Sequence, residues 1–552
     1  MVAAERMTPI PDDIERQPFD VIIIGAGING AGIARDAALR GLKVLLLDKG
    51  DIASGTTARS TRLIHGGLRY LEYYEVPLVR ESLREREILL RIAPHLVDPL
   101  QFLIPIYAGG KRGPGLIRLG MIAYDILSYD KSMANHRMLS REQTLALEPG
   151  LNPEGLRGAA LYYDAQITFP ERLAVENALS ARDHGAVVLT YCQVERPLTD
   201  GQGTVTGVTF TDLIGEGGRE YTVRAPVTVN VAGPWVDKVL GDLDPGRYIG
   251  GTKGSHIVVD AFPGAPKEAL YVEASADRRP YFIVPWNGRY MIGTTDLRYT
   301  GNLDHVVPDE EELTYLIDET NHVIPSAHLT RGDVLYAYAG VRPLPYKEEG
   351  TTGSITRKHI IHPHDAPLNR MISIVGGKIT TYRGLAEETT DLIFELLGRP
   401  VPPALTGKIP LPGGNTDDWA AFAADFTATS GLESAVAQRL LRIYGVMARQ
   451  ILRIAAGDPS LRQVFSPDSG AIAAEVPYAV RWELAETLED ILMRRGMVGF
   501  DDSTGLDALD NAAAIAQRTL GWDPARAQQE TAAYRQYLQQ FHPRALAKQA
   551  PL

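Results

Sequence analysis

Hydrophobic and polar positions follow three different patterns along the chain, and each pattern predicts a different kind of structure. Near the N-terminus, two short, fully apolar runs at 21–24 and 44–47 enclose a helix-forming segment, which predicts a buried strand, a helix and a second buried strand. Between 250 and 375, short β-rich runs alternate with turns and predict a mixed or antiparallel sheet. From 416 to 545 the pattern is almost wholly helical, which indicates a separate α domain.

Further elements connect these regions in an order typical of a nucleotide-binding domain that the chain leaves and re-enters. We expect helices at 78–93, 171–185 and 386–398, a strand at 186–194, a hairpin-like pair at 205–213 and 221–225, and a buried strand at 227–232. The fold class is therefore α/β plus α. It combines a discontinuous Rossmann-like domain, a second domain built on a mixed or antiparallel sheet, and a helical C-terminal domain.

Composition sets the domain boundaries. The polar segment 1–18 predicts a mobile tail, and 401–415, with four prolines and three glycines, predicts a linker. The two remaining domains are expected to be interleaved within 19–400. We place the nucleotide-binding domain at about 19–80, 150–250 and 370–400, the second, sheet-based domain at about 81–149 and 251–369, and the helical domain at 416–552.

The segment between the two N-terminal apolar runs carries glycines in the G-x-G-x-x-G spacing. Gly25, Gly27 and Gly30 allow a tight turn and let the backbone approach a pyrophosphate at the helix N-terminus. The second apolar run ends in Asp48, whose carboxylate can accept hydrogen bonds from both hydroxyls of a ribose. The same glycine pattern occurs by chance in ordinary strand–helix turns, but the flanking strands and the acidic residue favour a dinucleotide site.

Charge and cysteine content exclude several classes of function. The 552 residues carry a formal net charge of −12, which argues against general nucleic-acid binding. Cys192 is the only cysteine, so an intrachain disulfide and a cysteine zinc cluster are excluded. We expect no metal site at His359, His362 and His364 either, because no cysteine and a single nearby carboxylate accompany them. No apolar run reaches the ~18 residues of a transmembrane helix, so the protein is expected in the cytoplasm or on a membrane surface.

Two longer motifs are more specific than the glycine loop. IHGGLRYLE at 64–72 and GGKITTYR at 376–383 occur in order with KGSHIVV, IGTTD, YAGVRPL and ITRKH, and with an LPGG segment before the helical tail. From about residue 19 to about 540, the chain resembles the FAD-dependent glycerol-3-phosphate dehydrogenases of the respiratory type. One departure is visible at 230–235, which reads Asn-Val-Ala-Gly-Pro-Trp where that family has Asn-Ala-Thr-Gly-Pro-Trp. A contact from the threonine hydroxyl to the cofactor is therefore lost.

The resemblance implies FAD bound by the Rossmann-like domain, a substrate domain over the flavin ring and a helical cap. It implies oxidation of sn-glycerol 3-phosphate to dihydroxyacetone phosphate, with electrons passed to ubiquinone or menaquinone. Such an enzyme is peripheral on the inner, cytoplasmic face of the cell membrane. The electron acceptor, a homodimer and covalent attachment of FAD stay open. Three alternatives also stay open: an oxygen-using glycerol-3-phosphate oxidase, an amino-acid or amine oxidase on the same scaffold, and a non-catalytic flavin-binding sensor.

Cationic side chains are expected to bind the phosphate of such a substrate, because planar guanidinium groups match its oxygens. With the resemblance, Arg342 in GVRPL and Arg357 in ITRKH are the leading candidates. Arg69 and Tyr70 in LRYLE complete the expected pocket.

The proton of the substrate hydroxyl needs an acceptor, and several side chains are candidates for this chemistry. His65 comes first, since an imidazole titrates near neutral pH, but a role limited to positioning substrate or flavin stays open. His256 is a weaker candidate, with Lys253 beside it as electrostatic support. Lys378, in the motif that returns to the cofactor, is expected to stabilise reduced flavin or the substrate.

The remaining candidates for cofactor contact are mostly small or hydroxylated. They are Thr56, Thr57, Ser60, Val194, Gly233, Gly377, Lys378 and Thr380. The membrane hypothesis depends on 103–127, where Lys111, Arg112 and Arg118 accompany apolar residues as at a lipid headgroup boundary. A buried helix preceded by a basic loop is the other interpretation of that segment.

Overall fold

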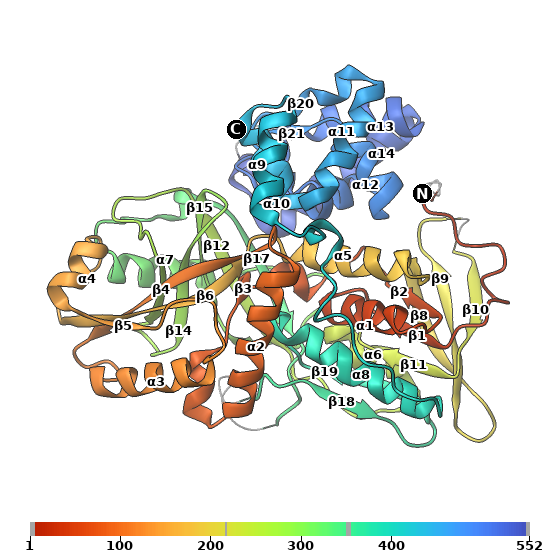
Figure 1. Ribbon diagram of the computed structural model, residues 1–552, viewed down its shortest axis with the longest axis horizontal. Helices are drawn as coiled ribbons and strands as arrows, with labels where there is room; N and C mark the ends of the chain where they lie inside the picture. The colour runs from red at the N-terminus through yellow and green to blue at the C-terminus, as the bar shows by residue number, and fades with distance from the viewer. Residues whose placement is uncertain (1–5, 216–217, 349–354, 548–552) are drawn as a thin grey trace.

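A six-stranded, mostly parallel sheet lies at the centre of the nucleotide-binding domain, as the computed structural model shows (Figure 1). The structure describes residues 6–215, 218–348 and 355–547. The strand order is β18 (Ile360–Pro363), β19 (Met371–Val375), β11 (Val227–Asn230), β1 (Val21–Ile24), β2 (Val44–Leu47) and β7 (Val187–Leu189). Neighbouring strands are parallel except β18 and β19. Every residue of β1, β2 and β11 is buried, which explains why their sequences lack an alternating pattern.

Successive residues of the central strand β1 pack into different layers. Val21 and Ile23 belong to the core formed with α1 (Ile28–Leu39), α5 (Pro170–Asp183) and α8 (Tyr382–Leu396). Ile22 and Ile24 belong to a second core, formed with a three-stranded antiparallel sheet. That sheet consists of β8 (Cys192–Thr199), β9 (Val205–Asp212) and β10 (Glu220–Arg224). The domain is therefore a three-layer structure, with helices on one face of the parallel sheet and strands on the other.

The second domain is built on a ten-stranded sheet, and the expected mixed sheet is confirmed. Its strands are β16 (Leu297–Arg298), β12 (Thr252–Val259), β15 (Arg289–Gly293), β14 (Pro280–Trp286), β13 (Ala269–Glu273), β4 (Val97–Tyr107), β6 (Leu156–Ile167) and β3 (Leu63–Ile64), with β17 (Val334–Arg342) on β12 and β5 (Arg137–Ser140) on β6. The pair of β4 and β13 is parallel, whereas the other recorded pairs are antiparallel. Helix α7 (Glu310–Val323) covers one face, and α2 (Val76–Ile92) and α3 (Pro114–Leu127) cover the other.

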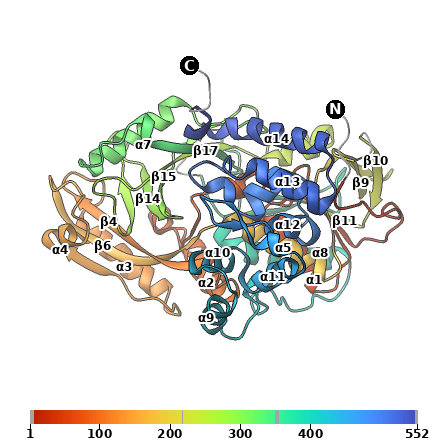
Figure 2. The same ribbon diagram turned by 90° about the horizontal axis from the view of Figure 1, so that it is seen from above.

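The C-terminal domain is helical and lies over the other two domains (Figures 1 and 2). Its elements are α9 (Trp419–Thr429), α10 (Ser434–Tyr444), α11 (Ala448–Gly457), α12 (Glu475–Glu483), α13 (Leu509–Leu520), α14 (Pro524–Leu538) and α15 (Arg544–Ala547), with a short hairpin of β20 (Val464–Ser466) and β21 (Ala471–Ile472). Residues 548–552 of the predicted domain lie outside the described chain. None of the helices in the described residues is long and apolar enough to span a bilayer.

The N-terminal segment differs from the expected mobile tail. Arg6 forms an ion pair of 2.7 Å with Asp212, and the backbone N–H groups of Met7 and Thr8 donate to the carboxylate of Glu486. Ile14 is buried. The prediction is therefore wrong for residues 6–18, because a polar sequence does not reveal partners that come from distant parts of the chain; residues 1–5 lie outside the described chain.

Other boundaries differ locally from the expectations. The predicted strand at 186–194 is two strands in different sheets, because the chain turns at Tyr191, whose φ is +55°. Helix α8 begins at Tyr382 rather than at 386, directly after a 3₁₀ turn at Ile379–Thr381. The proline-rich segment 401–415 is packed, with Leu411 buried and the N–H of Gly413 donating to Glu176 over 2.8 Å.

Candidate active site

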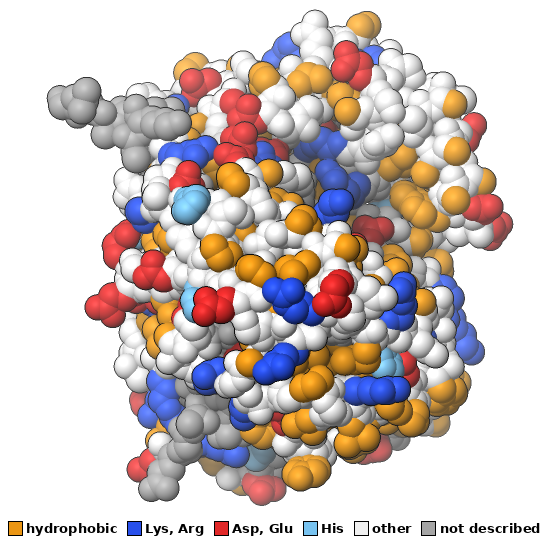
Figure 3. Space-filling view, turned by 90° about the vertical axis from the view of Figure 1, so that its left-hand side faces the viewer, with side chains coloured by type: hydrophobic (Ala, Val, Ile, Leu, Met, Phe, Trp, Pro, Cys, Tyr) orange, Lys and Arg blue, Asp and Glu red, His pale blue; other side chains and the backbone are white. Residues whose placement is uncertain are grey.

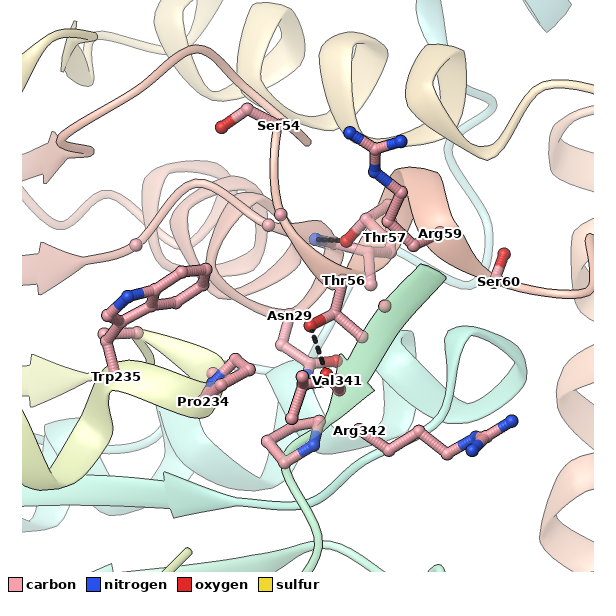
Figure 4. A pocket seen from close by; sticks show the side chains of 18 of the residues that line it. Asn29, Ser54, Thr56, Thr57, Arg59, Ser60, Pro234, Trp235, Val341 and Arg342 are labelled. Atoms are coloured by element: carbon pink, nitrogen blue, oxygen red, sulfur yellow. Dashed lines mark hydrogen bonds between the residues drawn. The ribbon is translucent and has the colours of Figure 1, made fainter. Parts of the chain in front are cut away.

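A cavity of about 620 Å³ lies where the three domains meet. In the close view of Figure 4, Trp235 and Arg342 lie on opposite sides of this cavity, with Thr56 and Thr57 between them. Most of the predicted site residues border it. They are Gly25, Gly27, Asp48, Thr56, Thr57, Ser60, His65, Tyr70, Val194, Gly233, His256, Arg342, Arg357, Gly377, Lys378 and Thr380. Gly30, Arg69 and Lys253 are the predicted residues that do not line it.

The glycine loop forms one wall of the cavity, and a side chain is disfavoured at each of its three glycines for a different reason. Gly25 has a φ of +113°, and a Cβ there would lie 2.7 Å from the carbonyl oxygen of Val231. A Cβ on Gly30 would lie 1.8 Å from the carbonyl oxygen of Gly25, so this residue lets helix and strand pack instead of lining the cavity. A Cβ on Gly27 would meet only Thr57 Oγ1 at 3.4 Å within the described chain, so its space faces the cavity.

The N-terminus of α1 and the carboxylate of Asp48 supply the polar groups that a dinucleotide needs. The N–H of Ile28 donates to Thr57 Oγ1 over 3.0 Å, and Thr56 Oγ1 donates to the carbonyl of Val341 over 2.7 Å. Asp48 accepts from the N–H groups of Ala26 and Gly50 over 2.5 and 2.8 Å. Burial raises the pKa of Asp48 to about 6, although these two donors oppose the shift.

These residues fit FAD as a bound group. A helix N-terminus, a backbone with no Cβ at Gly27 and the half-buried acid Asp48 stand side by side, as pyrophosphate and ribose require. The substitution in the Gly-Pro-Trp motif is compatible with this fit, because the methyl side chain of Ala232 still lets the backbone border the cavity. The valine of that motif, Val231, lies against the glycine loop.

Two arginines and an aspartate form the cationic end of the cavity. Asp296 Oδ1 lies 3.2 Å from Arg342 Nη1, and its Oδ2 lies 3.5 Å from Arg357 Nη2. Arg342 also donates to Thr294 Oγ1 over 3.0 Å. Burial lowers the pKa of Arg342 to about 10, Asp296 opposes this shift, and the neighbouring guanidinium of Arg357 adds to it. Within the described chain, the buried Nη1 of Arg357 has no hydrogen-bond partner, so this end offers a donor to an incoming anion.

His65 and Lys378 are brought together although they lie far apart in the sequence. Lys378 Nζ donates to the carbonyl of His65 over 3.4 Å and to Ser82 Oγ over 3.0 Å, and it stands 4.7 Å from the centre of the Tyr70 ring. Burial lowers the pKa of His65 to about 3, with further contributions from Lys378 and Arg86. The imidazole is therefore neutral near pH 7.

A buried network behind His65 was not found from the sequence. The N–H of Gly66 donates to Tyr124 Oη over 3.0 Å and to Asp164 over 3.3 Å. Asp164 also accepts from Tyr124 over 2.7 Å and from Arg86 over 2.6 Å. This network fixes the backbone next to His65. Its members come from α2, α3 and β6, and no sequence spacing connects them.

His256 and Lys253, its expected electrostatic support, lie on opposite faces of β12. His256 stacks on Tyr338 with ring centres 4.9 Å apart, and its Nε2 lies 2.9 Å from Thr61 Oγ1. Burial lowers the pKa of His256. Lys253 instead contacts Glu312 at 2.8 Å and Asp309, away from the cavity, so its assignment to the substrate site is wrong. The reason is the strand period of two, which places residues three apart on opposite faces.

Arg69 and the histidine-rich segment take positions outside the cavity. The Arg69 guanidinium stands 5.8 Å from the centre of the Tyr73 ring, close enough to the cationic end to lower the pKa of Arg342 further. In the described part of the chain, no group of three or more His, Cys, Asp or Glu side chains could hold a metal ion. His359 contacts Glu388, and His364 contacts Ser373.

Comparisons with known proteins agree with this geometry. A family model described as FAD dependent oxidoreductase matches residues 20–392, and one described as the C-terminal domain of alpha-glycerophosphate oxidase matches 404–527. The chain is 46% identical to a glycerol-3-phosphate dehydrogenase of Synechocystis, over 96% of this chain and 98% of that protein. It is 34% identical to an aerobic glycerol-3-phosphate dehydrogenase of Staphylococcus aureus, over 94% of each. Among solved structures, the glycerol-3-phosphate dehydrogenase of Bacillus halodurans complexed with FAD is similar with a TM-score of 0.78, at 29% identity and over 96% of each chain.

Proposed function

This chain belongs to the family of FAD-dependent glycerol-3-phosphate dehydrogenases, and we propose that it oxidises sn-glycerol 3-phosphate to dihydroxyacetone phosphate. Bound FAD would supply the acceptor for the hydride of the substrate C2 carbon. The observation that carries the proposal is the pair of guanidinium groups at one end of the cavity, held around Asp296, with a donor on Arg357 that has no partner among the described residues. An amino-acid substrate has no phosphate for this pair, which disfavours an amino-acid oxidase.

In this proposal Arg342 and Arg357 bind the phosphate, and His65 takes the proton of the substrate hydroxyl. A neutral imidazole has the acceptor that this step needs, and the negative charge of the arriving phosphate raises its proton affinity. Lys378 holds the His65 carbonyl and keeps the loop in place. The Tyr70 ring joins the two ends of the site, because it lies under the Lys378 ammonium and within electrostatic reach of Arg342.

Anaerobic mixing with glycerol 3-phosphate tests the reaction. The proposal expects bleaching of the flavin absorbance of the purified holoenzyme. It expects Arg357→Ala to weaken substrate binding by about 2–5 kcal/mol, because a buried contact to a charged group is lost. Arg331→Ala, at an exposed arginine paired with Glu310, is the control and should bleach as the wild type does. An unbleached wild-type flavin, or unchanged substrate affinity in Arg357→Ala, contradicts the proposal.

For the electron acceptor we propose a membrane quinone, supported by an apolar surface on α3. Helix α3 buries Ile117, Met121 and Tyr124 but leaves other large apolar side chains in solvent. These are Leu116, Leu119, Ile122 and Ile126, with exposed fractions of 58, 63, 42 and 66%. Figure 3 shows hydrophobic side chains gathered along the lower part of this side of the molecule, with lysines and arginines among them. A helix with apolar side chains on its outer face and neighbouring cations suits the headgroup boundary of a bilayer.

Sedimentation with anionic phospholipid vesicles tests this surface. We expect the wild type to co-sediment and the double variant Leu119→Gln/Ile126→Gln to remain in the supernatant. Leu213→Gln/Val464→Gln removes two other exposed apolar side chains, 48 and 46% exposed, and is the matched control. Equal sedimentation of both double variants would remove α3 from the proposed surface.

Oxygen is a second candidate for the electron acceptor. One finding favours it, the match of residues 404–527 to the C-terminal domain of alpha-glycerophosphate oxidase. The two acceptors are distinguished by how the substrate-reduced flavin is reoxidised. A quinone-linked enzyme reoxidises rapidly with a soluble quinone and slowly in air. Stoichiometric hydrogen peroxide formation in air would favour the oxidase.

A further inference from the structure

Three side chains of the C-terminal domain border the cavity in which the glycine loop lies. They are Glu489, Tyr537 at the end of α14, and Gln540 in the following 3₁₀ turn, Gln539–Phe541. The predicted site residues end at Thr380, so these three extend the site into a different domain. The cavity therefore has a wall that the nucleotide-binding domain does not supply.

Arg59 connects this wall to the loop that follows Asp48. The residue lies at the end of the 3₁₀ turn Thr56–Arg59 and borders the cavity. Its Nη2 donates to Tyr537 Oη over 3.2 Å, and its guanidinium carbon stands 4.2 Å from the centre of the Phe541 ring. A phenol and an aromatic face therefore hold one cation at the cavity, and both come from the C-terminal domain.

A second contact holds the same wall against the segment next to Asp48. Asp51 accepts from Arg494 Nε over 2.6 Å and from both terminal nitrogens of Arg495 over 2.8 Å each. Arg494 Nη1 lies 2.7 Å from a carboxylate oxygen of Glu489. The side chains of Asp51, Arg494 and Arg495 are at most 2% exposed, so this anchor excludes water. It sets the position of Glu489 relative to the nucleotide loop.

We propose that the C-terminal domain is part of the cofactor site, with Tyr537 positioning Arg59 for the pyrophosphate of FAD and Glu489 accepting a hydrogen bond from a hydroxyl of FAD. A guanidinium is the side chain that matches phosphate oxygens, whereas a carboxylate repels phosphates and accepts from hydroxyls. FAD release then requires α14 and the following turn to separate from the loop that carries Arg59. The proposal depends on FAD as cofactor and not on glycerol 3-phosphate as substrate, so the two can fail separately.

The dissociation rate of FAD tests the proposal, because it needs no substrate. Purified holoenzyme is diluted, and the rise of free-flavin fluorescence is followed for the wild type, Tyr537→Phe and Glu489→Ala, which has no side-chain acceptor. Loss of one hydrogen bond near a charged group should raise the rate constant about five- to tenfold in each variant. Tyr444→Phe is the matched control: it removes a hydrogen bond of 3.0 Å to Glu475 in the same domain, away from the cavity.

The control should release FAD within about twofold of the wild-type rate, since its lost bond does not reach the cofactor. Wild-type release rates in both test variants, or an equal increase in Tyr444→Phe, would overturn the proposal. Amide hydrogen exchange of the unmodified protein gives a second measurement that does not depend on how variants fold. Bound FAD should slow exchange at the end of α14 and in Gln539–Phe541 relative to apoprotein. Identical exchange in both forms would overturn the proposal as well.

Discussion

At the scale of single residues, two histidines stand without charge beside buried cations. Burial lowers the pKa of His65 to about 3, and His256 is shifted in the same direction. Unfolded histidine has a pKa of about 6.5, so below that pH the unfolded chain binds protons that the folded protein does not. Each such histidine therefore reduces the free energy of unfolding progressively as pH falls from about 6.5 towards its folded pKa.

The pH dependence of apoprotein stability should consequently change in His65→Asn. Between pH 7 and pH 5 the wild type should lose about 2 kcal/mol through His65, at about 1.4 kcal/mol per pH unit below 6.5. His65→Asn should lose that much less, and His305→Asn, at an exposed histidine, should follow the wild type. Urea unfolding of the apoproteins at both pH values measures this difference. Parallel losses in wild type and His65→Asn would show that His65 has the same pKa in the folded and the unfolded protein.

At the scale of elements, the turn between β1 and α1 contains one glycine that the fold needs and another that cofactor binding needs. A Cβ on Gly30 would lie 1.8 Å from a backbone oxygen, which cannot move without distorting the helix start. A Cβ on Gly27 would touch only Thr57 Oγ1 at 3.4 Å in the described chain, so the fold should accept it. Gly30→Ala should therefore lower the free energy of unfolding by roughly 2 kcal/mol or more, as for an overpacked core.

Gly27→Ala should behave differently, because its methyl group enters the space of the pyrophosphate. We expect the apoprotein to unfold within about 1 kcal/mol of the wild type while FAD affinity falls by at least about tenfold. Thermal unfolding of the apoproteins and titration with FAD measure the two effects. A Gly27→Ala protein that is purified with a full complement of FAD would contradict the assignment of this glycine.

The same element scale shows what the sequence can predict. The βαβ unit with Gly25, Gly27 and Asp48 is a local structure, so short-range pattern and spacing suffice to find it. The assignment of Lys253 to the substrate site could have been avoided from the sequence. Once β12 is taken as a strand, Lys253 and His256 must point to opposite faces. The break at Tyr191 was not predictable, because a tyrosine gives no sequence signal for a positive φ.

Contacts between residues from distant segments of the chain could not be predicted from the sequence. Asp296 is the last residue of the IGTTD motif, but its position between Arg342 and Arg357 depends on how β16 and β17 lie on β12. Tyr537 and Glu489 have no motif, and only the docking of the C-terminal domain brings them to the cavity. The local pattern therefore predicts the glycine loop and the family resemblance implies the cations, whereas packing between domains decides which residues surround them.

At the scale of the whole molecule, buried ion pairs join the C-terminal domain to the nucleotide-binding domain. Arg172 of α5 donates to both carboxylate oxygens of Glu483 at the end of α12, over 2.6 and 2.7 Å. Both side chains are 1% exposed. Unfolding of one domain alone would break this pair and the contacts of Asp51, and it would leave charged side chains of the other domain without their partners. Separate unfolding of the two domains is therefore unfavourable. We therefore expect one cooperative transition for the holoenzyme.

Glu483→Leu tests this coupling away from the cofactor. It leaves the Arg172 guanidinium buried without this partner and should lower the free energy of unfolding by about 3–5 kcal/mol, whereas Arg172→Met/Glu483→Leu, with neither charge of the pair left, should recover most of the loss. Asp425→Leu removes a surface pair with Arg449, 53 and 51% exposed, and should change little. Urea unfolding followed by far-ultraviolet circular dichroism and by FAD fluorescence should give coincident curves for every variant. If Glu483→Leu shifts only the circular dichroism curve, the domains unfold independently, and the ion pair stabilises the C-terminal domain alone.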